Sequence, residues 1–129
     1  MKRNLNPWVK TCVLTLAASV LVTACEGPMP GRFTRLGQPY PAKANDYNIE
    51  VFQDAPPSKP FTEIARFDVH MEEAFFAQPT LKDIMPELLR QARLSGADAI
   101  INIQERKSVL NETKILHVTA TGIKFADVP

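Results

Sequence analysis

Residues 83–103 read D-I-M-P-E-L-L-R-Q-A-R-L-S-G-A-D-A-I-I-N-I, a stretch that predicts a helix, a turn and a buried strand. Its apolar side chains recur at positions i, i+1, i+4, i+5 and i+8, which is the period of one helix face. They are Ile84, Met85, Leu88, Leu89 and Ala92. Gly96 follows Ser95 and is typical of the left-handed residue that ends a helix. One face of this helix must therefore lie against other apolar groups.

The start of the helix has two interpretations. Thr80 and Asp83 have the spacing of a capping box, but this choice places Pro86 beyond the first turn, where proline removes an internal hydrogen bond. With Asp83 as the N-cap, Pro86 falls at the third helical position, which has no intrahelical donor to lose. We expect the second arrangement.

Four stretches have the alternation of apolar and polar residues that is typical of strands. They are residues 46–52, 61–69, 97–104 and 114–125, and a turn around Asn111-Glu112 joins the last two. Ile64 interrupts the second stretch, which predicts a bulge there or a sheet covered on both faces. The parity of the last stretch reverses after Gly122, so we expect a bulge at Gly122 that brings Ile123 and Phe125 back to the core.

The order strand, strand, helix, strand, strand predicts an α+β fold with one helix on one face of a roughly four-stranded sheet. The other face is expected to be solvated, because its positions are mostly polar. They are Asn48, Glu50, Arg66, Asp68, Asn102, Gln104, Thr119 and Thr121. Open sheet edges leave a homo-oligomer as an alternative to a monomer.

Residues 1–24 have the layout of a secretory signal peptide, since basic residues precede an uncharged apolar run over 11–24. A membrane-spanning helix needs roughly 20 apolar residues, more than this run supplies. The run ends in L-V-T-A-C at positions 21–25, which resembles the lipobox of bacterial lipoproteins. The resemblance implies cleavage between Ala24 and Cys25 and attachment to the membrane through acyl chains on Cys25. An ordinary secretory signal is the alternative.

Removal of the signal peptide would change the charge and the cysteine content. It takes away three basic residues and leaves 12 basic and 14 acidic side chains. The remaining chain therefore lacks the excess of positive charge that is typical of nucleic-acid-binding domains. Cys12 would leave with the signal, so the folded part would contain no thiol, disulfide or cysteine metal site. Glu26, rather than Asp, follows Cys25, and by resemblance to lipoproteins this indicates the outer membrane, with the domain facing the periplasm.

Three regions follow from these patterns: a signal peptide over 1–24, a lipidated cysteine with a flexible tether over 25–45, and a periplasmic α+β domain over 46–129. The tether is expected from the four prolines and three glycines of residues 26–45. Docking of Phe33, Leu36 and Tyr40 on the domain or on a partner is the alternative.

The stretch H-M-E-E at residues 70–73 supplies the candidates for a metal site, together with one histidine of the last strand. His70, Glu72 and His117 are the main candidates, with Glu73 and Met71 as possible additions, because imidazole and carboxylate ligands suit Zn²⁺ or Cu²⁺. Two histidines without a fixed spacing are a weak signal, and surface histidines are the simpler interpretation. No cofactor is predicted.

Two further features are candidates for contacts. Phe75 and Phe76 are expected to tuck over the core, the alternative being an exposed anchor for a partner. Asp98 is expected to accept hydrogen bonds from backbone groups at the helix-to-strand turn, the alternative being a ligand contact. The sequence has no nucleophile motif and no glycine-rich phosphate loop, so we expect a protein that is not an enzyme.

The segment A-R-L-S-G-A-D-A-I-I-N-I at residues 92–103, with P-F-T-E-I-A-R-F before it and V-T-A-T-G-I-K-F after it, resembles the YbjQ-like family of small bacterial proteins. It is also similar to the periplasmic domain of Rcs-type stress-sensor lipoproteins. The likeness covers about residues 49–125. It implies a helix packed on strands, the binding of heavy metals, which is the function often assigned to the family, and ring-shaped homo-oligomers. The sensor domains carry disulfides, which this domain lacks, so the resemblance implies no redox switch.

Together these patterns predict a non-enzymatic lipoprotein whose domain serves as a protein-interaction, accessory or stress-sensing module of the bacterial envelope. The alternative is an oligomeric domain that binds a small ligand or a metal. The sequence names neither the partner nor the ligand.

Overall fold

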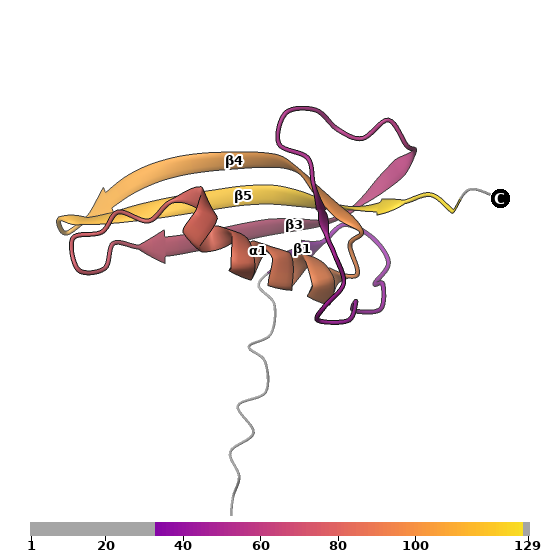
Figure 1. Ribbon diagram of the computed structural model, residues 1–129, viewed down its shortest axis with the longest axis horizontal. Helices are drawn as coiled ribbons and strands as arrows, with labels where there is room; N and C mark the ends of the chain where they lie inside the picture. Colours follow the sequence, from indigo (N-terminus) through magenta and orange to yellow (C-terminus); the bar gives the residue numbers. More distant parts are fainter. Residues whose placement is uncertain (1–32, 128–129) are drawn as a thin grey trace, which may run out of the picture.

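The computed structural model describes residues 33–127, which form one mixed sheet with one helix lying on it (Figure 1). In chain order the elements are β1 (Phe33–Arg35), β2 (Glu50–Val51), β3 (Phe61–Glu72), α1 (Leu81–Ser95), β4 (Ala99–Leu110) and β5 (Thr113–Phe125). The order in the sheet is β1-β3-β5-β4-β2, and the pairs are antiparallel except for β2 with β4. The predicted α+β class is confirmed, although the sheet has five strands rather than about four.

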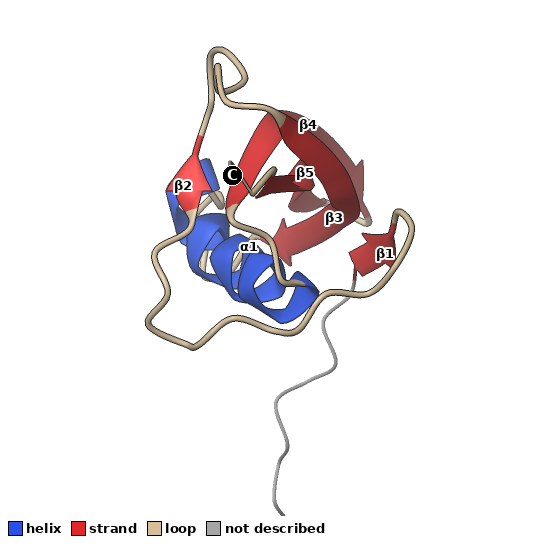
Figure 2. Ribbon diagram, turned by 90° about the vertical axis from the view of Figure 1, so that its right-hand side faces the viewer, coloured by secondary structure: helices blue, strands red, loops and turns tan. Residues whose placement is uncertain are grey.

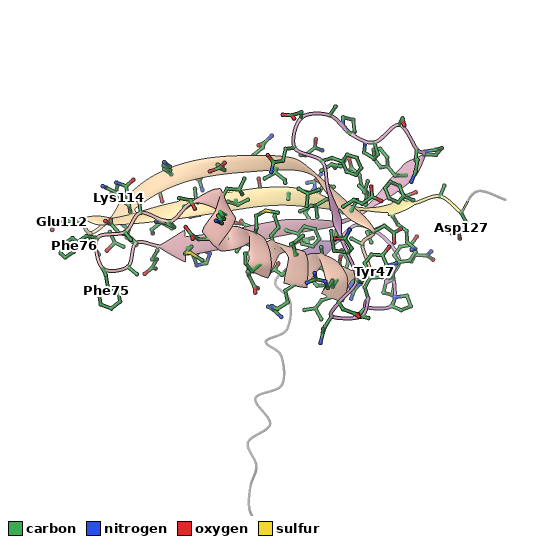
Figure 3. All side chains as sticks on the ribbon, viewed as in Figure 1. Tyr47, Phe75, Phe76, Glu112, Lys114 and Asp127 are labelled. Carbon is green, nitrogen blue, oxygen red and sulfur yellow. The ribbon has the colours of Figure 1, made fainter. Side chains whose placement is uncertain are left out.

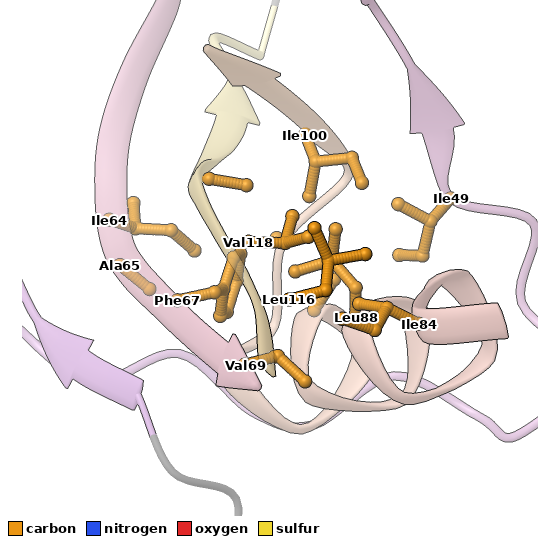
Figure 4. Close-up of a cluster of buried hydrophobic side chains, with 13 residues drawn as sticks. Ile49, Ile64, Ala65, Phe67, Val69, Ile84, Leu88, Ile100, Leu116 and Val118 are labelled. Atoms are coloured by element: carbon orange, nitrogen blue, oxygen red, sulfur yellow. The ribbon is translucent and has the colours of Figure 1, made fainter. Parts of the chain in front are cut away.

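The helix buries its predicted face against the sheet. Ile84, Leu88 and Ala92 are fully buried, and each of the two larger side chains stabilises the fold by about 1.5–3 kcal/mol through burial. They pack on side chains of β3 and β5, among them Phe67, Leu116 and Val118 (Figure 4). Figure 2 shows that α1 lies on one face of the sheet only.

The helix begins one turn earlier than expected. Thr80 is the N-cap, and the Asp83 carboxylate accepts hydrogen bonds from the backbone nitrogen and Oγ1 of Thr80 at 2.8 and 2.6 Å. The prediction of Asp83 as the N-cap is therefore wrong. The capping box provides hydrogen bonds at the helix start, and these offset the single internal bond that Pro86 removes inside the helix. The predicted glycine stop is confirmed, since Gly96 has a φ of 84°.

The bulges lie in the neighbours of β5 rather than at Gly122. The register shifts between Glu63 and Ala65 in β3, as the position of Ile64 predicted, and again between Ile101 and Gln104 in β4. Strand β5 itself keeps its alternation, so Ile123 lies on the face opposite the helix, and the prediction of a bulge at Gly122 is wrong. Ile123, Ala99 and Ile101 form a second small cluster that Phe52, Phe61 and Phe125 cover.

Gly122 serves another purpose, which is the close approach of a neighbouring ring. A Cβ atom at this position would lie 2.7 Å from the Cζ atom of Phe67. Phe67 is the residue of β3 that fills the centre of the core, and it pairs with Ala120. The small residues at 120 and 122 therefore make room for this ring.

Part of the predicted tether belongs to the folded domain. Strand β1 pairs with β3, and the backbone nitrogen of Lys43 donates to the carbonyl of Arg93 at 2.8 Å. A Cβ atom on Gly96 would lie 2.6 Å from the carbonyl oxygen of Pro41, so the chain crosses closely over the end of the helix. The expected start of the domain at residue 46 is therefore corrected, because the folded domain already includes Phe33. The signal peptide, Cys25 and residues 26–32 lie outside the described residues.

The strand lengths also differ from expectation. The stretch predicted over 46–52 is reduced to the two residues of β2, whereas β3 and β4 extend beyond their predicted ends at 69 and 104. The extended half of β4 is charged and exposed over 105–107, because it projects beyond the helix and meets water on both faces. Its residues therefore lack the alternation that marks a half-buried strand.

We expect Gly122→Ala to lower the free energy of unfolding by about 1–3 kcal/mol, because the added methyl group overpacks the core against Phe67. Denaturant unfolding of Gly122→Ala, Phe67→Leu and the double variant measures this. The double variant should be more stable than the sum of the two single losses predicts, since leucine vacates the contested space. Simple additivity would show that the two positions do not compete.

Candidate functional site

Two tight turns lie together at one end of the sheet, and Tyr47 lies toward the other end (Figure 3). The first turn joins Ala74 to Ala77, which form an isolated β-bridge, and the second, Asn111-Glu112, joins β4 to β5. The backbone nitrogen of Glu73 donates to the carbonyl of Lys114 at 2.8 Å and holds the first turn beside the strand that leaves the second. The end of the sheet is thus a fixed surface built by two turns.

Phe75 and Phe76 occupy the two central positions of the first turn and are 100% and 99% exposed. The prediction that they tuck over the core is wrong. Both have positive φ angles, 50° and 65°, so the turn directs them away from the strands, and a two-residue loop is too short to fold back. Leu110, beside the second turn, is 62% exposed. We call Phe75, Phe76 and Leu110 the apolar tip.

Charged groups surround the apolar tip. Glu73, Glu112 and Lys114 line the same open hollow as the two phenylalanines. Carboxylates therefore flank the aromatic side chains on both turns. A surface that covers the tip has to supply apolar contact at its centre and positive charge at its rim.

The sheet face opposite the helix carries the predicted polar side chains Arg66, Asp68, Gln104 and Thr119, whereas one end of this face carries the apolar cluster of Ala99, Ile101 and Ile123 and is not solvated. His70 on β3 lies directly opposite His117 on β5, with ring centroids 6.1 Å apart, and His117 lies opposite Arg106 on β4. His117 Nε2 is 2.8 Å from Ser108 Oγ. No sequence pattern predicted this serine–histidine contact, because the pairing register that creates it depends on the bulge in β4.

The structure brings together two of the three main metal candidates. His70 and His117 are cross-strand neighbours, whereas Glu72 pairs with Ile115, one row further toward the tip. Met71 packs against the core, so it does not share their face. Within residues 33–127 no three ligand side chains are placed to hold an ion. A structural zinc site needs four ligands, so the histidine pair alone does not make one.

The serine–histidine pair lacks the third member of a catalytic arrangement. An activated serine needs a base that is itself oriented by another group, usually a carboxylate. In the described part of the chain no carboxylate is hydrogen-bonded to His117. Ser95, another serine of the sequence, donates its hydroxyl to the carbonyl of Ala92 at the helix end. Both hydroxyl groups thus have structural partners.

Asp98 is the most fully bonded carboxylate of the domain. It accepts hydrogen bonds from Lys43 Nζ at 2.6 Å, from Tyr47 OH at 3.3 Å, from the Phe125 backbone nitrogen at 3.0 Å and from Lys124 Nζ at 3.4 Å. It joins the segment before β2 to the helix-to-strand turn and to the end of β5. The predicted role, binding of backbone donors, is confirmed for Phe125, which lies on β5 rather than at the turn itself.

The surroundings of Asp98 favour its ionised form. Burial by itself raises the pKa of this carboxyl group, but the hydrogen bonds from Lys43 and Phe125 and the charges of Lys124 and Lys43 outweigh it and lower the pKa. The same contact with Asp98 raises the pKa of Lys43. Asp98 is therefore an ionised acceptor that holds these three segments together, an arrangement that we call the clamp. Both of its carboxylate oxygens already have hydrogen-bond donors.

Comparisons with protein-family models, with curated proteins and with solved structures found no match for this chain. Over residues 33–127, α1 is neither long nor apolar enough to cross a membrane.

We expect Asp98→Asn to lower the free energy of unfolding at pH 7 by about 1–3 kcal/mol, since it removes the charge that Lys43 and Lys124 bind. Because folding lowers the pKa of Asp98, its contribution is present above about pH 4, the pKa in an unfolded chain, and is lost as the pH falls through the folded value.

Unfolding measured between pH 7 and pH 2 tests both statements. The difference between the parent protein and Asp98→Asn should narrow below about pH 4. Asp54→Asn, in an exposed loop, is the matched control and should follow the parent. A difference that stays constant with pH would contradict the role of the charge.

Proposed function

We propose that this chain is a lipoprotein anchored through Cys25, and that its α+β domain is a non-enzymatic module that binds another protein of the bacterial envelope through the apolar tip. The observation that carries the proposal is the pair Phe75-Phe76, which is fully exposed on a strained turn. An accessory or stress-sensing role would use the same contact.

The first turn is unfavourable for the isolated domain in two respects. A residue with a bulky side chain in the left-handed region costs on the order of 1 kcal/mol, and Asn-Gly is the sequence that such turns prefer. The two rings also expose apolar surface to water. Residues that break a local conformational preference without a compensating stabilising contact are characteristic of functional sites. Exposed aromatic side chains on a rigid turn are, in addition, typical anchors of protein interfaces.

The charges at the tip favour a protein partner over a lipid surface. Glu73, Glu112 and Lys114 flank the rings, so the net charge beside them is negative, and two carboxylates against one ammonium group would enter the headgroup region if the rings inserted into a bilayer. Anionic lipids repel such groups and attract lysine and arginine. An apolar groove with a basic rim matches the tip in both polarity and charge.

In this proposal the anchor on Cys25 holds the domain close to the membrane. Eight peptide units join Cys25 to Phe33, and a fully extended chain of that length spans at most about 28 Å. A domain on a connection of this length can reach partners at the membrane surface. The lipobox at residues 21–25 and Glu26 support an outer-membrane anchor that faces the periplasm, by resemblance to bacterial lipoproteins.

The double variant Phe75→Asn, Phe76→Gly tests the tip. It should raise the free energy of unfolding by about 1 kcal/mol, because it relaxes the turn, and it should abolish the protein adduct that an amine-reactive crosslinker captures in cells. Asn111→Gly changes the neighbouring turn, which also has a positive φ angle, and keeps both rings and both flanking carboxylates, so it should retain the adduct. An adduct that survives the loss of both rings would argue against the tip as the binding surface.

Cys25→Ser tests the anchor. Cells labelled with a radioactive fatty acid should incorporate label into the parent protein and not into Cys25→Ser, and only the parent should remain in the membrane fraction after carbonate washing. Cys12→Ser is the matched control, because that thiol leaves with the signal peptide. Unlabelled parent protein would refute the lipoprotein assignment and leave the tip to be judged by its own experiment.

A further inference from the structure

Strand β4 has an open edge over most of its length. Strand β2 pairs with Ala99 and Ile100 only, and on the side of β4 away from β5 no strand among residues 33–127 lies beside Ile103 to Val109. Figure 1 shows this half of β4 as the free border of the sheet, clear of α1. A long unpaired edge offers backbone donors and acceptors to another strand.

The closing turn identifies which residues present these groups. Leu110 and Thr113 are partners across the two-residue turn, so their backbone groups bond to one another across β4 and β5. Bonding alternates along an antiparallel strand, so Ser108, Arg106 and Gln104 also point toward β5. The residues between them present their N–H and C=O groups to the open edge. They are Ile103, Glu105, Lys107 and Val109.

The side chains of these four residues share the face on which the helix lies. Ile103 packs against the core, Val109 is 67% exposed, and Glu105 and Lys107 are exposed between them. The order along the edge is apolar, acidic, basic, apolar. When a second copy of this strand runs antiparallel to the first, each apolar residue can lie opposite an apolar residue and each acidic residue opposite a basic one.

We propose that two copies of this chain pair through the open edges of β4, antiparallel and related by a twofold axis at Arg106, to give one continuous sheet. Glu105 then lies opposite Lys107 of the second copy, and Ile103 lies opposite Val109 of the second copy. The symmetry doubles each contact, so four cross-strand pairs join the two edges. All four are pairs whose backbone groups face one another.

The charges select this register over its neighbours. Shifting the axis by one residue toward the start of β4 places Glu105 opposite Glu105 of the second copy, and shifting it toward the end places Lys107 opposite Lys107. Like charges directly opposite one another on a sheet are destabilising, and opposite charges are stabilising. Each shifted register therefore has one like-charge pair and no opposite-charge pair. The register centred on Arg106 has two opposite-charge pairs, Glu105 with Lys107 of the second copy and the symmetric pair, against the single like-charge pair of the two Arg106 side chains.

The rest of the domain is compatible with this arrangement. Pairing over 103–109 stops short of Ala99 and Ile100, which β2 occupies. Of β4, only Ile100 and Ile103 join the core that α1 covers, so Glu105, Lys107 and Val109 lie on the edge beyond that core. The two Arg106 side chains meet at the axis on the solvated face, where water screens their repulsion. Their replacement should therefore not weaken the pair.

Cysteine crosslinking of the full-length protein in cells tests the pairing and its register. Arg106→Cys places two thiols at the axis with Cα atoms about 4.5 Å apart, within the reach of a disulfide. Gln104→Cys, on the same exposed face, places its thiols about 13 Å apart along the strands, beyond that reach. Copper phenanthroline oxidation and non-reducing gels should show a disulfide dimer for Arg106→Cys and none for Gln104→Cys.

Charge reversal in the Arg106→Cys chain separates specific pairing from chance collision. Glu105→Lys and Lys107→Glu each turn attraction into repulsion at two symmetric contacts and should weaken pairing about tenfold. The double reversal restores opposite charges and should restore the dimer. All three changes lie at exposed positions, and circular dichroism of the purified chains confirms that they fold.

Three outcomes would overturn the proposal: no disulfide at position 106, equal crosslinking at positions 104 and 106, or a yield that ignores both single reversals. The proposal does not depend on the lipid anchor or on the apolar tip. The parent chain, which has no added cysteine, is oxidised as a control. A disulfide dimer of the parent would show that Cys25 is not acylated and carries a free thiol. The series is then repeated with Cys25→Ser, so the two ideas are judged separately.

Discussion

The burial of one helix face against two long strands is the constraint on which the rest of this structure depends. Ile84, Leu88 and Ala92 need an apolar surface about as long as the helix, and β3 and β5 supply it at one end. The strands continue past the helix start, so the sheet divides into a covered half and a projecting half. The apolar tip lies in the projecting half, and the proposed β4 edge runs into it from Ile103 at the border of the core.

The covered half is closed by groups from distant parts of the chain. Residues 40–43 cross the end of the helix, and their position is fixed by the close approach to Gly96 and by the bond from Lys43 to Asp98. Asp98 also receives the backbone nitrogen of Phe125, so one carboxylate connects three segments that the chain order keeps apart. This clamp replaces the disulfides that a cysteine-free domain lacks.

The projecting half shows the opposite balance between stability and function. Its turns have positive φ angles at residues that are not glycine, its charges are solvated on both faces, and its aromatic side chains face water. None of these features helps the isolated domain to fold. They are consistent with a region shaped by contacts to other molecules, and the rigid strands hold such contacts in fixed positions.

The periodicity of residues 83–103 by itself determined the helix and its glycine stop, and the alternation of the strand stretches added the α+β class, because these depend on local geometry and on the side-chain pattern. The bulge beside Ile64 also followed from the alternation of the strand. The position of Asp98 as an acceptor followed from residue type, but its lysine partners did not, since they come from segments more than twenty residues away.

Only the tertiary structure decided the start of the domain, the register of the strands and the exposure of Phe75 and Phe76. Strand β1 has no apolar period and exists because β3 offers it an edge. The bulge in β4 sets which residues face His117, and no local signal marks it. Composition and spacing record what a segment prefers, whereas pairing across a sheet depends on what its neighbours leave open.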